Sequence, residues 1–396
     1  MKDTMKKIMF ALVLVAVMSI SVVFANDENG DVTMAMTKSV EFGISRTTYG
    51  EYAAPASDAV GAQYNSLNLE IGLSKLRLFG YAQSTYYYKR VARENKNALD
   101  IQRFILMADA QLTRRLGFFL MYDAVKSEMH EYYAQYEVAP FMKVRVGQYK
   151  QPFTLESILS PTYLSTIQFD PSVLYLAGIA TDPLMGPHVA RDAGVMLTGD
   201  FLSNGERDLF NYSIGVFNGP GMNVKENNNQ KDVAGMLQYK PTKDILLEGS
   251  FIAGTGHAQT ASPFGFFPEG YNYSRHRWNV GVEAKLSPLY MRAEYIQGYD
   301  GGVHSRGGYV NMLCRIFKDC DLILNWDNLD KNVRTSRAEQ LALYDANGFV
   351  TRLNTYTAGM QWWFHKRCRF QGQFIYTQPR VGEISREFIT QLQIVF

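Results

Sequence analysis

The side chains that most often carry catalysis or bind metals are sparse here and form no recognisable motif. The three cysteines lack metal-ligand spacing; they fit best as small apolar strand residues, although Cys314 and Cys320 flank an expected tight turn and could pair. Gly301-Gly302 and Gly307-Gly308 lack the spacing of a phosphate-binding loop. The histidines match no catalytic arrangement: His130, His188, His257, His276, His304 and His365. We therefore expect no enzyme, no metal or cofactor, and no nucleic-acid partner.

Charged side chains instead recur at every second position. In the segment 142–149, one face carries Lys143, Arg145 and Tyr149, and the other face is apolar. Period two is typical of a β-strand with two different faces. A Lys or Arg facing lipid would cost about 2–4 kcal/mol near the middle of a membrane. The charged face is therefore expected to line water inside a pore, with the apolar face against lipid.

The same alternation repeats along most of the chain. It predicts sixteen strands, near 75–88, 100–111, 115–125, 130–139, 141–149, 191–202, 207–218, 231–240, 243–254, 275–287, 288–299, 306–317, 319–328, 353–364, 367–378 and 385–396. The count is even, as single-chain bacterial barrels require. We expect an all-β fold: a transmembrane antiparallel β-barrel of about 16 strands.

The connections between these segments support the same architecture. Most even-numbered connections are tight, as at Pro140 and Ser287-Pro288, whereas the odd-numbered ones include long segments: 89–99, 150–190, 219–230, 255–274 and 329–352. Segments 126–129 and 300–305 are short exceptions. Short periplasmic turns and longer external loops are typical of outer-membrane barrels. Aromatic residues at segment ends, such as Tyr86-Tyr87-Tyr88, and the terminal Phe396 fit this interpretation.

The first 25 residues have the layout of a secretory signal peptide. Three lysines precede an apolar run from Ile8 to Phe24, and Val23-Phe24-Ala25 forms a small-residue cleavage site. The alternative is an N-terminal membrane anchor, but the run is short for a spanning helix. Removing 1–25 takes away three lysines and one aspartate, which leaves 40 − 3 = 37 basic and 38 − 1 = 37 acidic residues. Export to the bacterial outer membrane is expected, with 26–74 a periplasmic lead-in or the start of the barrel.

The connection 150–190 is too long for an ordinary loop. It follows the fifth segment and contains apolar, Pro-marked stretches such as 161–164 and 171–176. We expect this third external loop to fold inward and narrow the pore. The alternative is an external lid or a contact surface between subunits.

Three stretches resemble the phosphate-selective porin O and P family. They are Val146–Glu156 (VGQYKQPFTLE), Arg191–Gly199 (RDAGVMLTG), and Gly215–Gly221 (GVFNGPG) followed by Asn227–Asp232 (NNNQKD). The resemblance covers 75–396 and implies a sixteen-stranded barrel, a homotrimer and an inward third loop. It also implies Arg and Lys side chains along the passage. Candidates are Arg103, Lys143, Arg145, Lys150 and Arg191 near the third loop, and, farther along the chain, Arg277, Arg292, Arg315 and Arg369.

The third loop departs from a phosphate site. Between Gln151 and Ala190 it has no Lys or Arg, and its ionisable candidates are Glu156, Asp170, Asp182 and His188. Mixed charge signs partly cancel in setting ion selectivity. We therefore expect a weakly selective diffusion channel for small polar solutes or ions, with outer-membrane lipid as its surroundings. The alternatives are a phosphate- or anion-selective porin, or a surface-exposed structural barrel.

Overall fold

The computed structural model describes residues 67–71, 74–186 and 188–396. The expected signal peptide, 1–25, lies outside the described residues, as does most of the lead-in 26–74. From that lead-in the structure describes β1 (Leu67–Ile71), which pairs antiparallel with the start of β2. No helix in the described part of the chain is long and apolar enough to cross a membrane.

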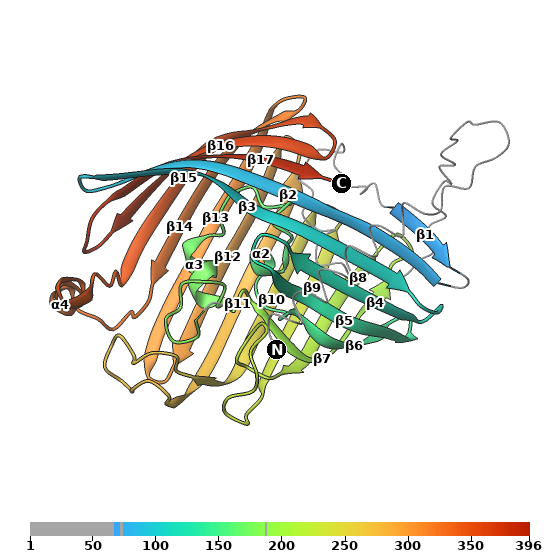
Figure 1. Cartoon of the computed structure of the whole chain (residues 1–396), viewed down its shortest axis with the longest axis horizontal. Coiled ribbons are helices and arrows are strands. Elements are labelled where there is room, and N and C mark those ends of the chain that lie inside the picture. The colour runs from blue at the N-terminus through green and yellow to red at the C-terminus, as the bar shows by residue number, and fades with distance from the viewer. Residues whose placement is uncertain (1–66, 72–73, 187) are drawn as a thin grey trace. The chain divides into compact units, whose positions relative to one another are not determined.

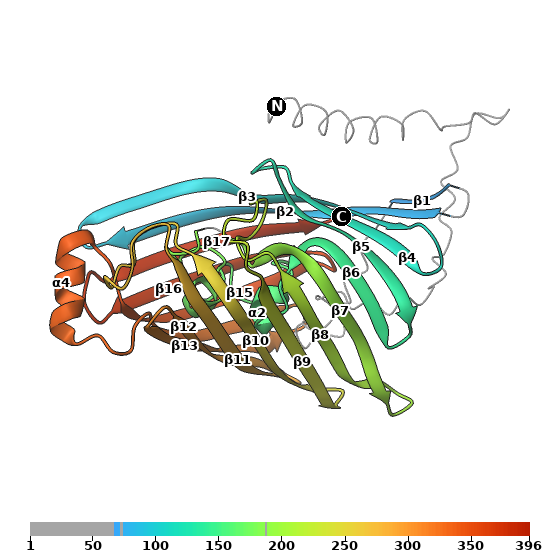
Figure 2. The ribbon, with the colours of Figure 1, turned by 90° about the horizontal axis from the view of Figure 1, so that it is seen from below.

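Sixteen antiparallel strands form a closed barrel, which confirms the predicted fold and strand count (Figures 1 and 2). Each strand pairs with its neighbours in sequence, and β17 pairs with β2 to close the sheet. The strands are β2 (Ser74–Val91), β3 (Glu94–Gln111), β4 (Leu116–Asp123), β5 (Glu128–Ala139), β6 (Met142–Lys150), β7 (Arg191–Ser203), β8 (Asp208–Phe217), β9 (Asp232–Thr242), β10 (Ile245–His257), β11 (Asn272–Leu286), β12 (Leu289–Asp300), β13 (Val303–Phe317), β14 (Cys320–Asp330), β15 (Arg352–His365), β16 (Cys368–Pro379) and β17 (Ser385–Val395). Closure leaves no free sheet edge along the wall, which a membrane requires because lipid offers no hydrogen-bond partners.

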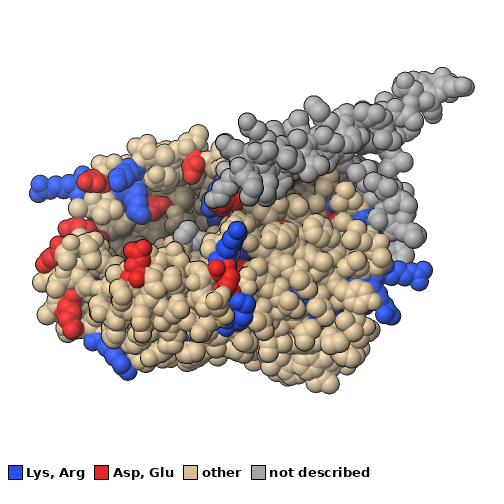
Figure 3. Space-filling model, turned by 60° about the horizontal axis from the view of Figure 1, so that its bottom comes forward, with Lys and Arg blue, Asp and Glu red and all other residues tan. Residues whose placement is uncertain are grey.

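The two faces of each strand differ as the alternation predicted. In β11 the outward Trp278 and Val280 are 44% and 51% exposed, whereas Arg277 and Asn279 point inward and are buried. Uncharged side chains cover most of the wall seen in Figure 3. The apolar face therefore meets lipid, and the polar face meets the lumen.

The pairing of β2 with β17 forms the closing seam of the barrel. Gly80 and Phe396 exchange two backbone hydrogen bonds of 2.9 Å, just beyond the last residue of β17. Beyond the end of β17, β1 pairs with the same edge of β2, since Leu67–Ile71 pairs with Ser74–Leu78. The terminal Phe396 ring lies 6.0 Å from the Phe104 ring on β3.

The connections alternate in length, with one correction. The predicted long loop 89–99 is wrong, because β2 and β3 continue in register to a tight turn at 92–93. Residues 89–98 are mostly polar on both faces of the two strands, so the sequence lacks the apolar–polar alternation that indicates a strand. These strand ends lie beyond the apolar belt of the wall. The other long connections remain, although β10 and β11 shorten 255–274 to 258–271. The connection 331–351 contains α4 (Arg337–Asn347), capped by Ser336 and Glu339 at its start and Gly348 at its end.

Candidate permeation pathway

The third loop, residues 151–190, folds into the barrel, as predicted. It contains two short helices, α2 (Leu155–Ile158) and α3 (Pro171–Leu176), and both lie within the ring of strands in Figure 1. Thr154, Glu156 and Val173 are 0% exposed. Such burial excludes an external lid for this segment and makes the loop part of the core.

Apolar side chains hold one side of the loop against the wall. Phe153, Val173 and Leu176 from the loop share a buried cluster with wall residues of several strands: Met196, Phe217, Ala234, Ile252, Ile296, Tyr309 and Leu329. Burying a side chain of this size stabilises a fold by about 1.5–3 kcal/mol. The main hydrophobic core of this barrel therefore lies inside it, between loop and wall.

Polar side chains of the wall satisfy the loop backbone. Gln371 and Gln373 on β16 both donate to the carbonyl of Ser165, at 2.9 and 2.8 Å. Glu294 on β12 accepts from the amides of Leu155 and Glu156, at 2.6 and 3.0 Å. Asp327 on β14 accepts from the amide of Ser172 at 3.0 Å. Buried backbone groups need such partners, so much of the polar wall serves the loop rather than the solute.

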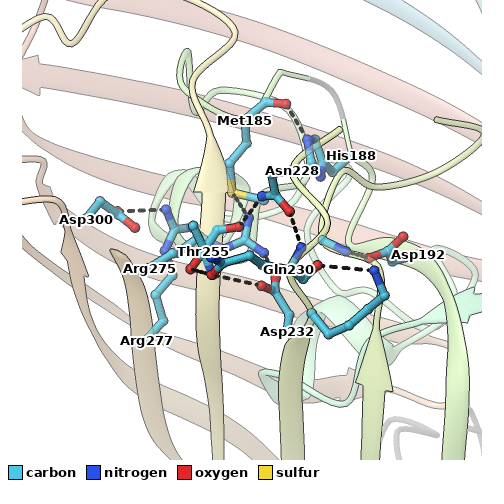
Figure 4. Close-up of polar contacts among 12 residues, drawn as sticks. Met185, His188, Asp192, Asn228, Gln230, Asp232, Thr255, Arg275, Arg277 and Asp300 are labelled. Atoms are coloured by element: carbon cyan, nitrogen blue, oxygen red, sulfur yellow. Dashed lines mark hydrogen bonds and ion pairs between the residues drawn. The ribbon is translucent and has the colours of Figure 1, made fainter. Parts of the chain in front are cut away.

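Arginines on β11 fasten the second half of the loop (Figure 4). Arg277 forms ion pairs with Asp182 at 2.7 Å and with Asp300 at 2.8 Å, and it donates to the carbonyl of Leu176 at 2.7 Å. Arg275 forms a buried ion pair with Asp232 on β9, and its other nitrogen contacts the sulfur of Met185. These contacts tie the loop to the wall at two adjacent inward positions.

The three motifs of the family resemblance meet at the root of this loop. Tyr149 is the cross-strand partner of Asp192, and its ring packs edge-on against Phe217 with centroids 5.7 Å apart. The Asp192 carboxylate accepts from the amides of Ala193 and Gly219. Residues of the three motifs therefore contact one another where the third loop leaves β6 and returns to β7. This role is structural.

The acidic residues of the loop face the wall that carries β12 and β14. Glu156 accepts from the amide of Asp170 at 3.2 Å, and Asp170 accepts from Asn325. Burial, together with the neighbouring Glu294, raises the pKa of Glu156 to about 8, against the opposing effect of Arg292. Burial and the nearby Glu156 also raise the pKa of Asp170 well above its ordinary value. These two carboxyls are covered by the loop itself.

The remaining ionisable loop candidates bond locally. Asp182 forms its ion pair with Arg277 on β11. The His188 ring bonds to the carbonyl of Met185, and burial, with Arg275 nearby, lowers its pKa to about 4. His188 is therefore neutral near pH 7. A Cβ at Gly221 would lie 2.3 Å from His188 Nδ1, so the fourth external connection closes tightly over this ring.

Three basic candidates gather on the opposite side, near β3, β6 and β7. Lys150 and Arg191 are cross-strand partners, and Arg103 lies within electrostatic range of Arg191. Arg191 pairs with Glu131 at 2.9 Å, Lys150 donates to the carbonyl of Leu159, and Arg103 donates to Gln83 at 2.8 Å. Lys150 and Arg191 are buried, and Arg103 is half-buried.

Solvent reaches the lumen most readily beside β3–β5. Inward side chains of this wall, including Phe119, Tyr133 and Gln135, are half-buried. On the wall of β13 and β16, Asn311 and Gln371 are at most 1% exposed, and both form hydrogen bonds with Ser165 of the loop. The open part of the lumen therefore adjoins β3–β5 and the basic group just described.

The other predicted lumen residues all take inward positions but are scattered. Arg145 donates to Gln135 at 2.8 Å and stacks on Tyr133, while Lys143 is fully buried beside it in β6. Arg315 pairs with Asp321 at the short-turn end. Arg369 donates to Gln361 and Gln393, at 3.0 and 3.1 Å. Arg292 is 1% exposed, and its three side-chain nitrogens have no hydrogen-bond partner among the described residues.

Sequence reasoning missed two parts of this site. Arg275 begins the predicted strand 275–287 but is absent from the predicted lumen residues, although it has the same parity as Arg277 and Asn279. The glutamines of β16 and β17 are uncharged, so the search for charged lumen residues does not identify them. Both groups hold the loop, and only the loop's position reveals their role.

Comparisons with known proteins place the fold. The channel DcaP of Acinetobacter baumannii superposes with a TM-score of 0.58 at 10% identity, covering 83% of this chain and 99% of that one. OprB of Pseudomonas putida gives 0.58 at 10%, covering 80% and 94%. OmpF of Salmonella typhi, solved with daunomycin, gives 0.55 at 12%, covering 83% and 100%. The chain has the porin fold.

These neighbours are bacterial outer-membrane porins, and at such identities the likeness concerns fold alone. No protein-family model matches the sequence, and no curated protein matches it. The phosphate-selective family is therefore not confirmed by these comparisons.

Replacing Arg277 by Gln should loosen the second half of the loop. The change leaves Asp182 and Asp300 as buried carboxylates without their cation, and breaking such a pair costs about 3–5 kcal/mol. We expect faster amide hydrogen exchange across 171–186, measured by mass spectrometry. The control is Arg315→Gln, which breaks an ion pair far from the loop. Equal protection of 171–186 in wild type and Arg277→Gln would contradict this role.

Alkaline pH should weaken loop docking through Glu156. Its pKa rises from an ordinary 4.5 to about 8, so the docked loop favours the protonated acid. This stabilisation is complete below pH 4.5 and is lost as the pH rises through 8. We expect hydrogen exchange in 151–170 to accelerate between pH 6 and pH 9 after correction for intrinsic rates, and Glu156→Gln to flatten that dependence. An unchanged pH dependence in Glu156→Gln would contradict the assignment.

Proposed function

We propose that this protein is a passive diffusion channel of the bacterial outer membrane for small polar solutes or ions, with weak selectivity. The observation that carries the proposal is the uneven lumen: the loop packs on one wall, and half-buried polar side chains remain beside β3–β5. A sixteen-stranded barrel is wide enough to leave a water-filled lumen around a packed loop. The proposal includes no catalytic step and no cofactor, and it includes a cleaved leader and a homotrimer.

Arg103, Lys150 and Arg191 are the residues we propose to set the sign of the selectivity. They form a basic group near β3, β6 and β7 in which Arg103 is half-buried, and the loop carboxyls of Glu156 and Asp170 face the other wall. Lys143, Arg145, Arg292, Arg315 and Arg369 are secondary proposals, because they are scattered along the wall, whereas Lys150 and Arg191 lie beside the half-buried Arg103. Arg277 we assign to holding the loop.

A second candidate is an anion-selective channel of the phosphate-selective kind. The gathering of Arg103, Lys150 and Arg191 favours it, since a phosphate needs several convergent donors. Glu131, ion-paired to Arg191, and Asp123, near Arg103, oppose it. Competing carboxylates at the same place reduce the attraction for an anion, so we place the weakly selective channel first.

Reconstitution into a planar bilayer tests the proposal. We expect stable single-channel conductance in KCl and a small zero-current potential in a salt gradient. Arg103→Glu should shift the permeability ratio toward cations by about two- to five-fold, since it changes the local charge by two at several ångströms. The control is Arg114→Glu, an exposed position in the 112–115 turn. Absence of conductance would refute the channel, and an unchanged ratio in Arg103→Glu would remove Arg103 from the pathway.

Phosphate addition separates the two candidates. Block of the chloride current by submillimolar phosphate would favour the anion-selective channel. Unchanged current would favour the weakly selective one.

A further inference from the structure

Two arginines lie directly opposite each other on the outer face of the closing seam. Arg90 on β2 is the cross-strand partner of Arg386 on β17, and both are exposed. They lie one residue from the strand ends, at the rim that carries the long connections. Their location is therefore the upper edge of the lipid-facing wall.

The neighbouring rungs establish that this pair points outward. One rung further in, Lys89 and Glu387 form an ion pair of 3.4 Å, and Glu387 also accepts from Gln168 of the third loop, so that rung faces the lumen. The next rung pairs Phe388 with Tyr88, which are 46% and 40% exposed. Since successive side chains alternate between faces, Arg90 and Arg386 share the outer face with Phe388 and Tyr88.

The arrangement is electrostatically unfavourable as it stands. Like charges directly opposite each other destabilise a strand pair, and neither arginine forms an ion pair with any described carboxylate, including Glu383 in the preceding turn. Arg90 donates only to the nearby carbonyl of Ala92, at 3.4 Å, and the Arg386 guanidinium lies 5.7 Å from the centre of the Tyr376 ring. Most donors of both guanidinium groups remain available to an anion.

An apolar strip begins immediately beneath the pair. Tyr86 and Tyr88 on β2 are 41% and 40% exposed. Leu99 on β3, the cross-strand partner of Tyr86, is 80% exposed. On β17 the strip continues down the wall through Leu392 and Ile394. Aromatic residues at this height mark the membrane interface. Positive charge above an apolar wall matches an amphiphile with an anionic head.

We propose that Arg90 and Arg386 bind the phosphate of an outer-leaflet lipid head group, with an acyl chain along the strip below. A phosphate monoester carries up to two negative charges and accepts from two guanidinium groups at once. Binding would also neutralise the repulsion between the arginines. The inference depends on the barrel spanning an outer membrane, and it does not depend on conduction.

Native mass spectrometry of the detergent-solubilised full chain tests this site. The probe is lipid A, a glycolipid with two phosphates, titrated against wild type and Arg90→Gln/Arg386→Gln. The matched control is Arg114→Gln/Arg115→Gln, which removes the same charge from exposed residues at the opposite end. We expect the seam variant to retain about ten-fold less lipid A, and the control to behave as wild type, because charge-assisted hydrogen bonds are lost only at the seam.

Equal retention by the seam variant and wild type would overturn the proposal, as would equal losses in both variants. Displacement of lipid A by equimolar inorganic phosphate would also overturn it, because the site would then recognise phosphate without lipid. Circular dichroism and the heat-dependent gel shift of folded barrels verify that each variant is folded. Conductance of the seam variant should match wild type, so failure of the channel proposal is observed separately.

Discussion

The need to satisfy buried backbone groups inside a membrane constrains this structure at two levels. The wall meets it by closing β17 onto β2, so that every strand along the barrel has two neighbours. The third loop has no regular sheet to join, and its amides and carbonyls must find partners on the inner wall. Glutamine, asparagine and carboxylate side chains of β10–β17 supply them. The polar lumen is therefore in large part a binding surface for the protein's own loop.

This division explains the unequal charge distribution of the lumen. On the packed side, the loop residues Glu156 and Asp170 are buried near Glu294 and Asn325 of the wall, where burial favours their protonated forms. Because these carboxyls are covered, they contribute little to the field in the open part of the lumen. On the open side, Arg103 is half-buried, and the neighbouring Arg191 is balanced in part by Glu131. The net field there is set by few residues, which is why weak selectivity is the expected result.

Much of the architecture could be predicted from the sequence because its signal is periodic and repeated. Sixteen alternating segments gave strand positions within a few residues, and the length and apolar content of 150–190 indicated an inward fold. The extension of β2 and β3 to a turn at 92–93 could not be predicted, because the apolar face ends where the membrane ends. The strands above that level are held by cross-strand pairing, which leaves no hydrophobic pattern.

The candidate site was only partly predictable for a different reason. Inward orientation follows from parity along one strand for residues such as Lys143 and Arg145, whereas Lys150 directly follows the inward Tyr149 at the end of β6. Which of them remain near water depends on contacts between segments far apart in the chain, such as Arg277 with Asp182 or Arg369 with Gln393. No local pattern encodes those contacts. The same holds for the stretches of the family resemblance at 146–156 and 191–199, whose residues support the loop root.

Thiol accessibility on the two sides of the lumen tests the central claim most directly. In a chain whose three cysteines are replaced by alanine, single cysteines at Gln135 and Gln371 would be reacted in the folded state with a small water-soluble thiol reagent. The account predicts rapid modification of Gln135→Cys, beside β3–β5, and strong protection of Gln371→Cys beneath the loop. Equal reactivity at both positions, or protection at both, would contradict it.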